Sequence, residues 1–162
     1  MNIIITGPKR CGKSTVLQKL LPRLGGKKSG FITSFPDRSA EDKCLLISSL
    51  DGSLGRCAVK WKSGVPDVDR AAFDTFAPSL IDISSDYVVI DELGKFEKSS
   101  ESLKSAVEAA FDAPCHVIAS IRLDADGWMQ ALKSREDVTV LTLNGLNRDS
   151  IPDRIQSLID PC

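Results

Sequence analysis

The sequence offers little for a metal cage or a membrane anchor. Its 162 residues contain one histidine, His116. A histidine without clustered partners is a weak signal for a metal site, so we expect it to pack within a strand. No apolar run approaches the length that spans a bilayer. The chain enters a predicted strand at its first residues, and we expect no signal or transit peptide. These absences favour a cytoplasmic protein without a membrane partner.

The sequence also lacks a large net charge of either sign and closely spaced pairs of cysteines. The net charge of −1 at pH 7 argues against bulk electrostatic attraction to nucleic acid or to a membrane surface. The cysteines form no C-x-x-C pair and their number is odd, so we expect reduced, unpaired thiols, as in cytosolic proteins. The five are Cys11, Cys44, Cys57, Cys115 and Cys162.

The hydrophobic pattern predicts an α/β protein. A hydrophobic content of 42% over 162 residues is sufficient for one domain with its own core, residues 1–162. Apolar runs predict strands at residues 3–6, 28–34, 44–48, 56–61, 87–90, 117–121 and 138–143. Helical periodicity predicts helices directly after residue 14, over 67–83 with an interruption at Pro78, from Ser99 or Ser100 to Phe111, over 128–132 and over 150–159. This alternation indicates three layers, with a mainly parallel sheet between helices.

One motif indicates a ligand. Residues 7–14 match G-x-x-x-x-G-K-S between a predicted strand and a predicted helix, which is the context of a phosphate-binding loop, or Walker A motif. Its glycines let the backbone bend around phosphate oxygens, and the loop N–H groups and the helix N-terminus then meet the anion. The alternative is a glycine-rich turn with a solvated lysine. We expect the nucleotide to be bound by Gly7, Pro8, Lys9, Arg10, Cys11, Gly12, Lys13, Ser14 and Thr15.

Individual residues of this loop suit different parts of a nucleotide. Lys13 would reach the β- and γ-phosphates, and the Ser14 hydroxyl is a hard oxygen ligand for Mg²⁺. Thr15 either contacts the α-phosphate or caps the helix. Lys9 and Arg10 either add charge near the phosphates or remain solvated loop residues.

A second motif supplies carboxylates. Asp91 and Glu92 directly follow the apolar run at residues 87–90, as in a Walker B element. The carboxyl end of such a strand faces the crevice in which open α/β sheets bind ligands. Asp91 would hold Mg²⁺ directly or through water, and Glu92 would orient or deprotonate an attacking water. The alternative is a solvated turn at the end of a strand.

With both motifs in place, the chain resembles the nucleoside-triphosphatase family first described in thermophiles, which includes the vertebrate cancer-related nucleoside-triphosphatase. The block D-E-hydrophobic-G-K-hydrophobic-E at residues 91–97 is the most specific part of the resemblance. The other matching stretches are residues 4–15, 29–33 and 135–149.

The resemblance implies a RecA-like P-loop NTPase with a small inserted β-hairpin at residues 43–62. It implies slow, Mg²⁺-dependent hydrolysis of ATP, GTP, CTP and UTP to diphosphate and phosphate, with little base selectivity. It also places residues 30–33 beside the nucleotide, Lys95 and Glu97 at the flank of the active site, and Asn147 and Arg148 on the base side or as sensors.

Two further questions stay open in the sequence. An arginine finger in cis could come from four candidates, which are Arg10, Arg122, Arg135 and Arg148.

Two other functions also use a P-loop. A nucleotide or small-molecule kinase would need an acceptor pocket and usually an arginine-rich lid, and residues between the strands show no arginine cluster of that kind. A nucleotide-binding switch or adaptor for guanine would normally carry N-K-x-D, which residues 147–149 do not match.

Overall fold

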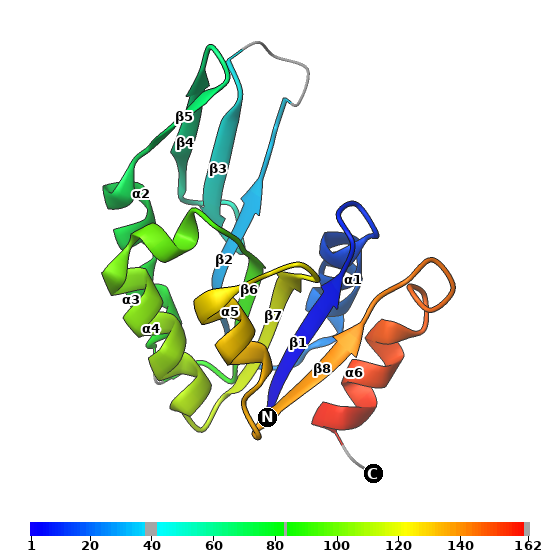
Figure 1. The fold of residues 1–162 in the computed structure, drawn as a ribbon. Helices are drawn as coiled ribbons and strands as arrows, with labels where there is room; N and C mark the ends of the chain where they lie inside the picture. The colour runs from blue at the N-terminus through cyan, green and yellow to red at the C-terminus, as the bar shows by residue number, and fades with distance from the viewer. Residues whose placement is uncertain (38–41, 83, 161–162) are drawn as a thin grey trace.

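The fold is organised around one sheet of eight strands (Figure 1). A computed structural model describes residues 1–37, 42–82 and 84–160. The strand order in the sheet is β5-β4-β3-β2-β6-β7-β1-β8. The strands are β1 (Asn2–Gly7), β2 (Lys28–Ser34), β3 (Cys44–Ser49), β4 (Gly55–Lys62), β5 (Val65–Val68), β6 (Tyr87–Leu93), β7 (His116–Arg122) and β8 (Val138–Thr142).

The five strands from β2 to β8 in this order run parallel to one another. All six residues of β1 are buried, and β6 and β7 are buried over most of their length. Strands covered on both faces are expected to be continuously apolar, which is why their runs were recognisable in the sequence. The arrangement confirms the predicted RecA-like sheet, because β7 lies between the P-loop strand β1 and the acidic strand β6.

Helices cover both faces of the sheet and bury two separate apolar clusters (Figure 1). Helices α1 and α6 pack on one face, and the other four pack on the opposite face. The helices are α1 (Lys13–Leu20), α2 (Arg70–Asp74), α3 (Ala77–Leu80), α4 (Glu101–Asp112), α5 (Gly127–Lys133) and α6 (Ile151–Ile159), with short 3₁₀ turns η1 (Leu21–Arg23) and η2 (Glu97–Ser99). Ser100 caps α4 by accepting a hydrogen bond from the N–H of Leu103 at 3.1 Å.

The predicted hairpin is present as β3 and β4, but it belongs to a larger antiparallel extension of the sheet. The prediction of one interrupted helix over residues 67–83 is wrong in its first part, because Val65–Val68 forms β5 and pairs with β4. Pro66 is tolerated there because β5 is the edge strand and leaves one side unpaired. Asp69 then caps α2, and α3 follows with Pro78 in its first turn. Ile83 lies outside the described residues.

The expectation of unpaired cysteines is wrong for two of them. Cys44 on β3 and Cys57 on β4 form a disulfide with their Cα atoms 5.9 Å apart. Disulfide formation depends on the separation of two Cα atoms in space, which the antiparallel pairing sets here. Cys11 and Cys115 carry free thiols, and Cys162 lies outside the described residues. The cysteines therefore no longer support the expected cytoplasmic location.

Within the described ranges, no helix combines the length and the apolarity that a membrane crossing requires. His116 lies in β7 as expected, and its ring stacks on that of Tyr87 with the centroids 5.3 Å apart.

We predict that Gly30→Ala destabilises the fold by about 3 kcal/mol. Gly30 has φ +121°, and a Cβ at this position would lie 1.9 Å from the backbone oxygen of Val89 on the neighbouring strand β6. Backbone cannot move aside as a flexible side chain can. Urea denaturation of both proteins measures the difference in the free energy of unfolding.

Gly25→Ala is the matched control, since a Cβ there meets no atom within 4 Å. We expect that variant to stay within about 1 kcal/mol of the parent. Equal stability of the two alanine variants would contradict the close approach of β2 and β6 at Gly30.

Candidate functional site

The phosphate-binding loop spans the gap between the end of β1 at Gly7 and the start of α1 at Lys13. Gly12 adopts φ +103°, a conformation that favours glycine. A Cβ on Gly7 would lie 2.7 Å from Cys11 Sγ and 2.8 Å from the carbonyl oxygen of Leu143, so both glycines are needed for the loop to close. Helix α1 begins with the N–H of Val16 donating to the carbonyl of Gly12 at 3.0 Å.

Lys13 is buried with 5% of its surface exposed, which is unusual for an ammonium group. Its Nζ donates to the carbonyl oxygens of Gly7 at 3.3 Å and Pro8 at 3.2 Å. It also lies 3.4 Å from Glu92 Oε2. The lysine therefore links the phosphate loop to the end of β6.

Asp91 is 2% exposed at the end of β6. Its Oδ1 accepts a hydrogen bond from Ser120 Oγ on β7 at 2.6 Å, and Ser14 also donates to it. Burial raises the pKa of this carboxyl, while the two hydroxyl groups and the charge of Lys13 act in the opposite direction. The interposed strand β7 thus supplies a direct partner for the acidic residue.

The donor set around Asp91 fits a magnesium ion. A buried carboxylate and the Ser14 hydroxyl are hard oxygen ligands, and Mg²⁺ usually combines one or two of these with substrate phosphates and water. Across the part of the chain that the structure describes, no group of three or more His, Cys, Asp or Glu could hold a metal. One carboxylate and one hydroxyl leave the remaining positions around Mg²⁺ to substrate phosphates and water, so the site suits a metal that arrives with a nucleotide.

Glu92 is 30% exposed and faces the loop. Its N–H donates to Thr33 Oγ1 on β2 at 3.0 Å, which fixes the backbone of the residue. Burial raises its pKa and so does the neighbouring charge of Asp91, whereas Lys13 and Arg122 act to lower it. A carboxylate in this position has both the access and the basicity that a general base requires.

Glu97, which the resemblance placed at the flank of the active site without a role, is a buried acid. It is 3% exposed, and its Oε2 accepts a hydrogen bond from the N–H of Gly94 at 2.8 Å. Burial raises its pKa to about 7, and the charge of Glu92 contributes in the same direction. The residue lines the same pocket as Glu92 and holds the turn that follows β6.

These residues surround a pocket of about 530 Å³. Its walls come from the loop, the end of β2, the antiparallel extension and the turn after β6. The lining residues are Lys9, Arg10, Gly12, Lys13, Ser14, Thr15, Thr33, Ser34, Phe35, Leu45, Trp61, Glu92, Gly94, Lys95, Phe96, Glu97 and Arg122. Sequence reasoning missed the aromatic part of this wall. The ring centroids of Phe35 and Trp61 lie 5.5 Å apart, as do those of Trp61 and Phe96.

Arg148 lies beside the phosphate loop, and neither Arg148 nor Asn147 is among the residues that line the pocket. A Cβ on Gly12 would lie 2.6 Å from Arg148 Cδ, so this arginine packs over the loop glycine. The side chain of Asn147 accepts from the N–H of Asn144 and donates to the carbonyl of Thr142, each at 2.9 Å. Asn147 therefore shapes the loop that carries Arg148.

The four candidate arginine fingers are not equivalent. Arg10 and Arg122 line the pocket. Arg122 is held by Asp124, with Nε and a terminal nitrogen donating at 2.9 and 2.6 Å. Arg135 precedes the amino end of β8 and pairs with Asp112 and Asp137. Because β8 runs parallel to β1, the amino end of β8 lies at the opposite end of the strands from the loop. Arg135 therefore lies away from the phosphate loop, and the prediction that it is a candidate arginine finger is wrong.

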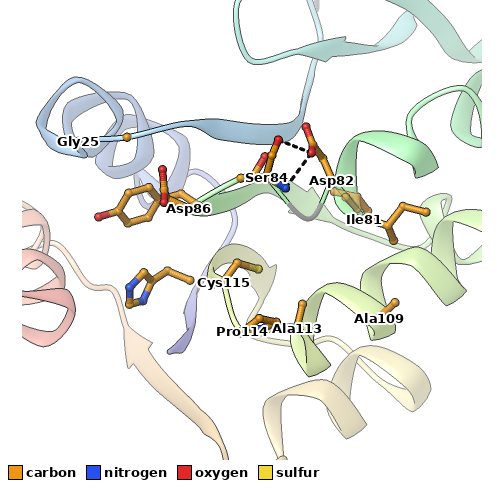
Figure 2. A pocket seen from close by; sticks show the side chains of 14 residues that line it. Gly25, Ile81, Asp82, Ser84, Asp86, Ala109, Ala113, Pro114 and Cys115 are labelled. Carbon is orange, nitrogen blue, oxygen red and sulfur yellow. Dashed lines mark hydrogen bonds between the residues drawn. The ribbon is translucent and has the colours of Figure 1, made fainter.

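A larger pocket of about 750 Å³ lies near the amino ends of β6 and β7, away from both motifs (Figure 2). Its lining includes Asp82, Asp86, Cys115 and His116 but no residue of the phosphate loop. Ser84 donates to Asp82 through both its N–H, at 3.0 Å, and its hydroxyl, at 2.6 Å. Volume alone does not identify the candidate site: of these two pockets, the smaller one is lined by residues of both motifs.

A strand-loop-helix phosphate site, an acidic strand end and one strand between them define a P-loop NTPase. A family model described as NTPase matches residues 2–156. The nucleoside-triphosphatase THEP1 of Thermotoga sp. (strain RQ2) is 30% identical over 98% of this chain and 95% of its own length. That of Thermotoga petrophila is 31% identical over 93% and 88%. The chain belongs to the nucleoside-triphosphatase family, whose curated members are enzymes.

Two solved structures support the fold. THEP1 from the hyperthermophile Aquifex aeolicus superposes with a TM-score of 0.83 at 26% identity, covering 99% of both chains. A human cancer-related nucleoside triphosphatase gives a TM-score of 0.81 at 21% identity, covering 98% of this chain and 97% of the other. The predicted fold class and family resemblance are thereby confirmed.

We predict that Glu97 lowers stability as the pH rises from about 4.5 to about 7. Its pKa is higher in the folded than in the unfolded chain, so the folded state holds a proton that the unfolded state releases, and stability falls through this window. The total loss is about 3 kcal/mol. Glu97→Gln should remove that part of the decline, as measured by urea denaturation at pH 5 and pH 7.5.

Glu136→Gln, at an exposed position, is the control and should keep the pH dependence of the parent. If Glu97→Gln also kept it, the carboxyl of Glu97 would not be protonated in the folded protein at pH 5.

Proposed function

We propose that the protein hydrolyses nucleoside triphosphates to diphosphate and phosphate in a Mg²⁺-dependent reaction at the loop and the end of β6. The single observation that carries this proposal is the convergence of a buried lysine with two adjacent carboxylates. Lys13 Nζ lies 3.4 Å from Glu92 Oε2, and its charge also acts on Asp91. Catalysis of phosphoryl transfer consists mostly of positioning and charge stabilisation, which such a group provides.

Each part of the site has a defined task in this proposal. The loop N–H groups and Lys13 bind the β- and γ-phosphates, and Thr15 lies near the α-phosphate. Ser14 and Asp91 would hold Mg²⁺, whose positive charge would stabilise the charge of the phosphates. Glu92 orients the attacking water and accepts its proton. The hydrogen bond between Thr33 and the Glu92 N–H keeps the carboxylate at the γ-phosphate end of the loop.

Support for the proposal of broad base specificity comes from the side of the loop opposite Glu92. The base would lie near the segment between β8 and α6, where Asn147 and Arg148 are placed. The amide of Asn147 is already engaged with Asn144 and Thr142, and Arg148 packs over Gly12. Leu146, with 99% of its surface exposed, offers a base only apolar contact. We therefore propose that ATP, GTP, CTP and UTP all serve as substrates.

We propose slow turnover on the basis of the ion pair that Arg122 forms. Arg122 lines the pocket and its charge acts on Glu92, but Asp124 holds its guanidinium in a two-bonded ion pair. An arginine at the γ-phosphate is worth roughly 10³–10⁵ in rate, and an arginine kept in an ion pair does not supply it.

We predict that Glu92→Gln lowers kcat by about 10² to 10⁴, because the amide keeps the size of the side chain but cannot accept a proton. The dissociation constant for a non-hydrolysable ATP analogue should change by less than about threefold, because phosphate binding lies with the loop. Phosphate release and isothermal titration calorimetry measure the two quantities. Glu101→Gln, on the exposed first turn of α4, is the control. A parent-like rate in Glu92→Gln would remove Glu92 from the mechanism.

We also predict that hydrolysis of the four nucleotides differs by less than about tenfold, and that Lys13→Ala and removal of Mg²⁺ each abolish it. A phosphate-release panel over ATP, GTP, CTP and UTP, with and without Mg²⁺, measures these rates. Hydrolysis of one nucleotide alone would contradict broad specificity, whereas full activity without Mg²⁺ would contradict the role of Ser14 and Asp91.

A further inference from the structure

We propose that the larger pocket, at the amino ends of β6 and β7, is a second ligand site that binds a small organic ammonium ion with an apolar body. The pocket shares no lining residue with the nucleotide site. Strand β6 runs from one pocket to the other, since Tyr87 lines the larger pocket and Glu92 lines the smaller one. The proposal therefore concerns a separate site and does not depend on the proposed hydrolysis.

The pocket is built by segments that are far apart in the sequence. The turn before β2, the segment before β6, the end of α4 and the start of β7 all contribute lining residues. In Figure 2, Asp82 and Ser84 lie on one side of the pocket, and Ala113 and Pro114 lie on the other. The volume of about 750 Å³ falls within the range of about 300–1,000 Å³ that is typical of small-molecule sites. The fold therefore forms a cavity of the size that a small organic molecule occupies.

Two carboxylates line the pocket, those of Asp82 and Asp86. Among the described residues, no lysine or arginine lines it. Asp82 is already paired, because Lys27 Nζ lies 2.8 Å from its Oδ2. Asp86 accepts the backbone N–H of Lys27 through Oδ2 at 2.7 Å, but it joins none of the ion pairs found within the described ranges. The carboxylate of Asp86 is therefore the group that an ammonium ion would pair with.

The imidazole of His116 also lines the pocket, but it supplies no positive charge at neutral pH. Burial lowers its pKa, and the charge of the chain N-terminus acts in the same direction, whereas Asp160 and Asp86 act to raise it. The amino group of Met1 lies 3.3 Å from Nδ1 of this ring, and Met1 does not line the pocket. The ring is therefore neutral at pH 7, and it leaves the charge of Asp86 unpaired.

A buried hydroxyl group indicates a ligand independently of the carboxylates. Ser85 lines the pocket with 6% of its surface exposed, and its Oγ has no hydrogen-bond partner among the described residues. The neighbouring Ser84, by contrast, donates to Asp82 through both its N–H and its hydroxyl. Buried polar groups are usually hydrogen-bonded, so the unpartnered oxygen of Ser85 requires an explanation. An N–H donor of a bound ammonium ion would supply the missing partner.

Part of the pocket is apolar. It is formed by Ile81, Ala109, Ala113 and Pro114 (Figure 2). Ile81 is 55% exposed, and an apolar ligand would remove its side chain from water. Burial raises the pKa of the Cys115 thiol, which therefore stays protonated and behaves as a small apolar group. An ammonium group attached to an apolar body suits the acidic and the apolar parts of the pocket together.

The same residues do not suit a metal ion. Within the parts of the chain that the structure describes, no group of three or more His, Cys, Asp or Glu could hold one. A metal ion needs several ligand atoms that converge on it, whereas an organic ammonium ion needs one carboxylate and a hydrogen-bond acceptor. The chemistry of the pocket therefore favours an organic cation.

Binding is tested by NMR titration of the isotope-labelled protein with two probes of opposite charge. Phenethylammonium carries the expected charge on an aromatic body, and hydrocinnamate carries a carboxylate on a body of the same kind. We expect the first probe to shift the amide signals of Asp86 and His116 in a saturable way, with a dissociation constant at least about tenfold smaller than that of the second. Equal binding of the two probes, or shifts that do not saturate, would overturn the ammonium site.

Two substitutions test the position of the probe. Asp86→Asn keeps the size of the side chain and an oxygen for the Lys27 N–H but removes the charge, so we expect the affinity for phenethylammonium to fall at least about tenfold. Ala109→Phe, at an exposed position of α4, should fill the pocket and abolish saturable binding. Asp67→Asn, at an exposed position of β5, is the control and should bind the probe as the parent does. Parent-like affinity in Asp86→Asn or in Ala109→Phe would place the probe elsewhere and overturn the proposal.

Discussion

The buried ammonium group of Lys13 is the interaction on which the site depends. Burial raises the affinity of both Asp91 and Glu92 for protons, and the charge of Asp91 acts in the same direction on Glu92. An unpaired charge in such an environment is costly, so the lysine and the two acids stabilise each other as a group. The lysine also holds the carbonyls of Gly7 and Pro8, which couples the shape of the loop to the charge of the strand end.

The position of β7 determines how these groups meet. Placed between β1 and β6, this strand separates the loop from the acids by one strand width and lets Ser120 contact Asp91 directly. The pocket then opens sideways along the carboxyl ends of the strands, toward the antiparallel extension β3-β4-β5. That extension contributes Leu45 and Trp61, which are remote from both motifs in the sequence, to the same cavity.

The sequence predicted the features whose geometry depends on local spacing. The conformation of a G-x-x-x-x-G-K-S loop, or of a strand that ends in two acids, is determined by a few consecutive residues. The buried parallel strands are recognisable in the sequence as apolar runs. Features that arise from contacts across the sheet were missed. The edge strand β5 contains Pro66 and has little apolar surface. Cys44 and Cys57 meet only through strand pairing. The contacting rings of Phe35, Trp61 and Phe96 come from three segments that are distant in the sequence. Arg135 was misplaced because it precedes β8, and only the parallel pairing of β8 with β1 shows that the amino end of β8 lies away from the phosphate loop.

The central place of β1 has a consequence for biosynthesis. Asn2 pairs with Val117 on one side and with Val138 on the other, so the first strand of the chain gains its two neighbours from the last third. Contacts over such long separations form late, after the intervening chain has been ordered. While the ribosome is still making residues 123–142, the residues of the phosphate loop have already been made. The strand β8, which pairs with β1 beside the loop, is still incomplete. A nascent chain therefore acquires the full support of its nucleotide site only after residue 142 has been made.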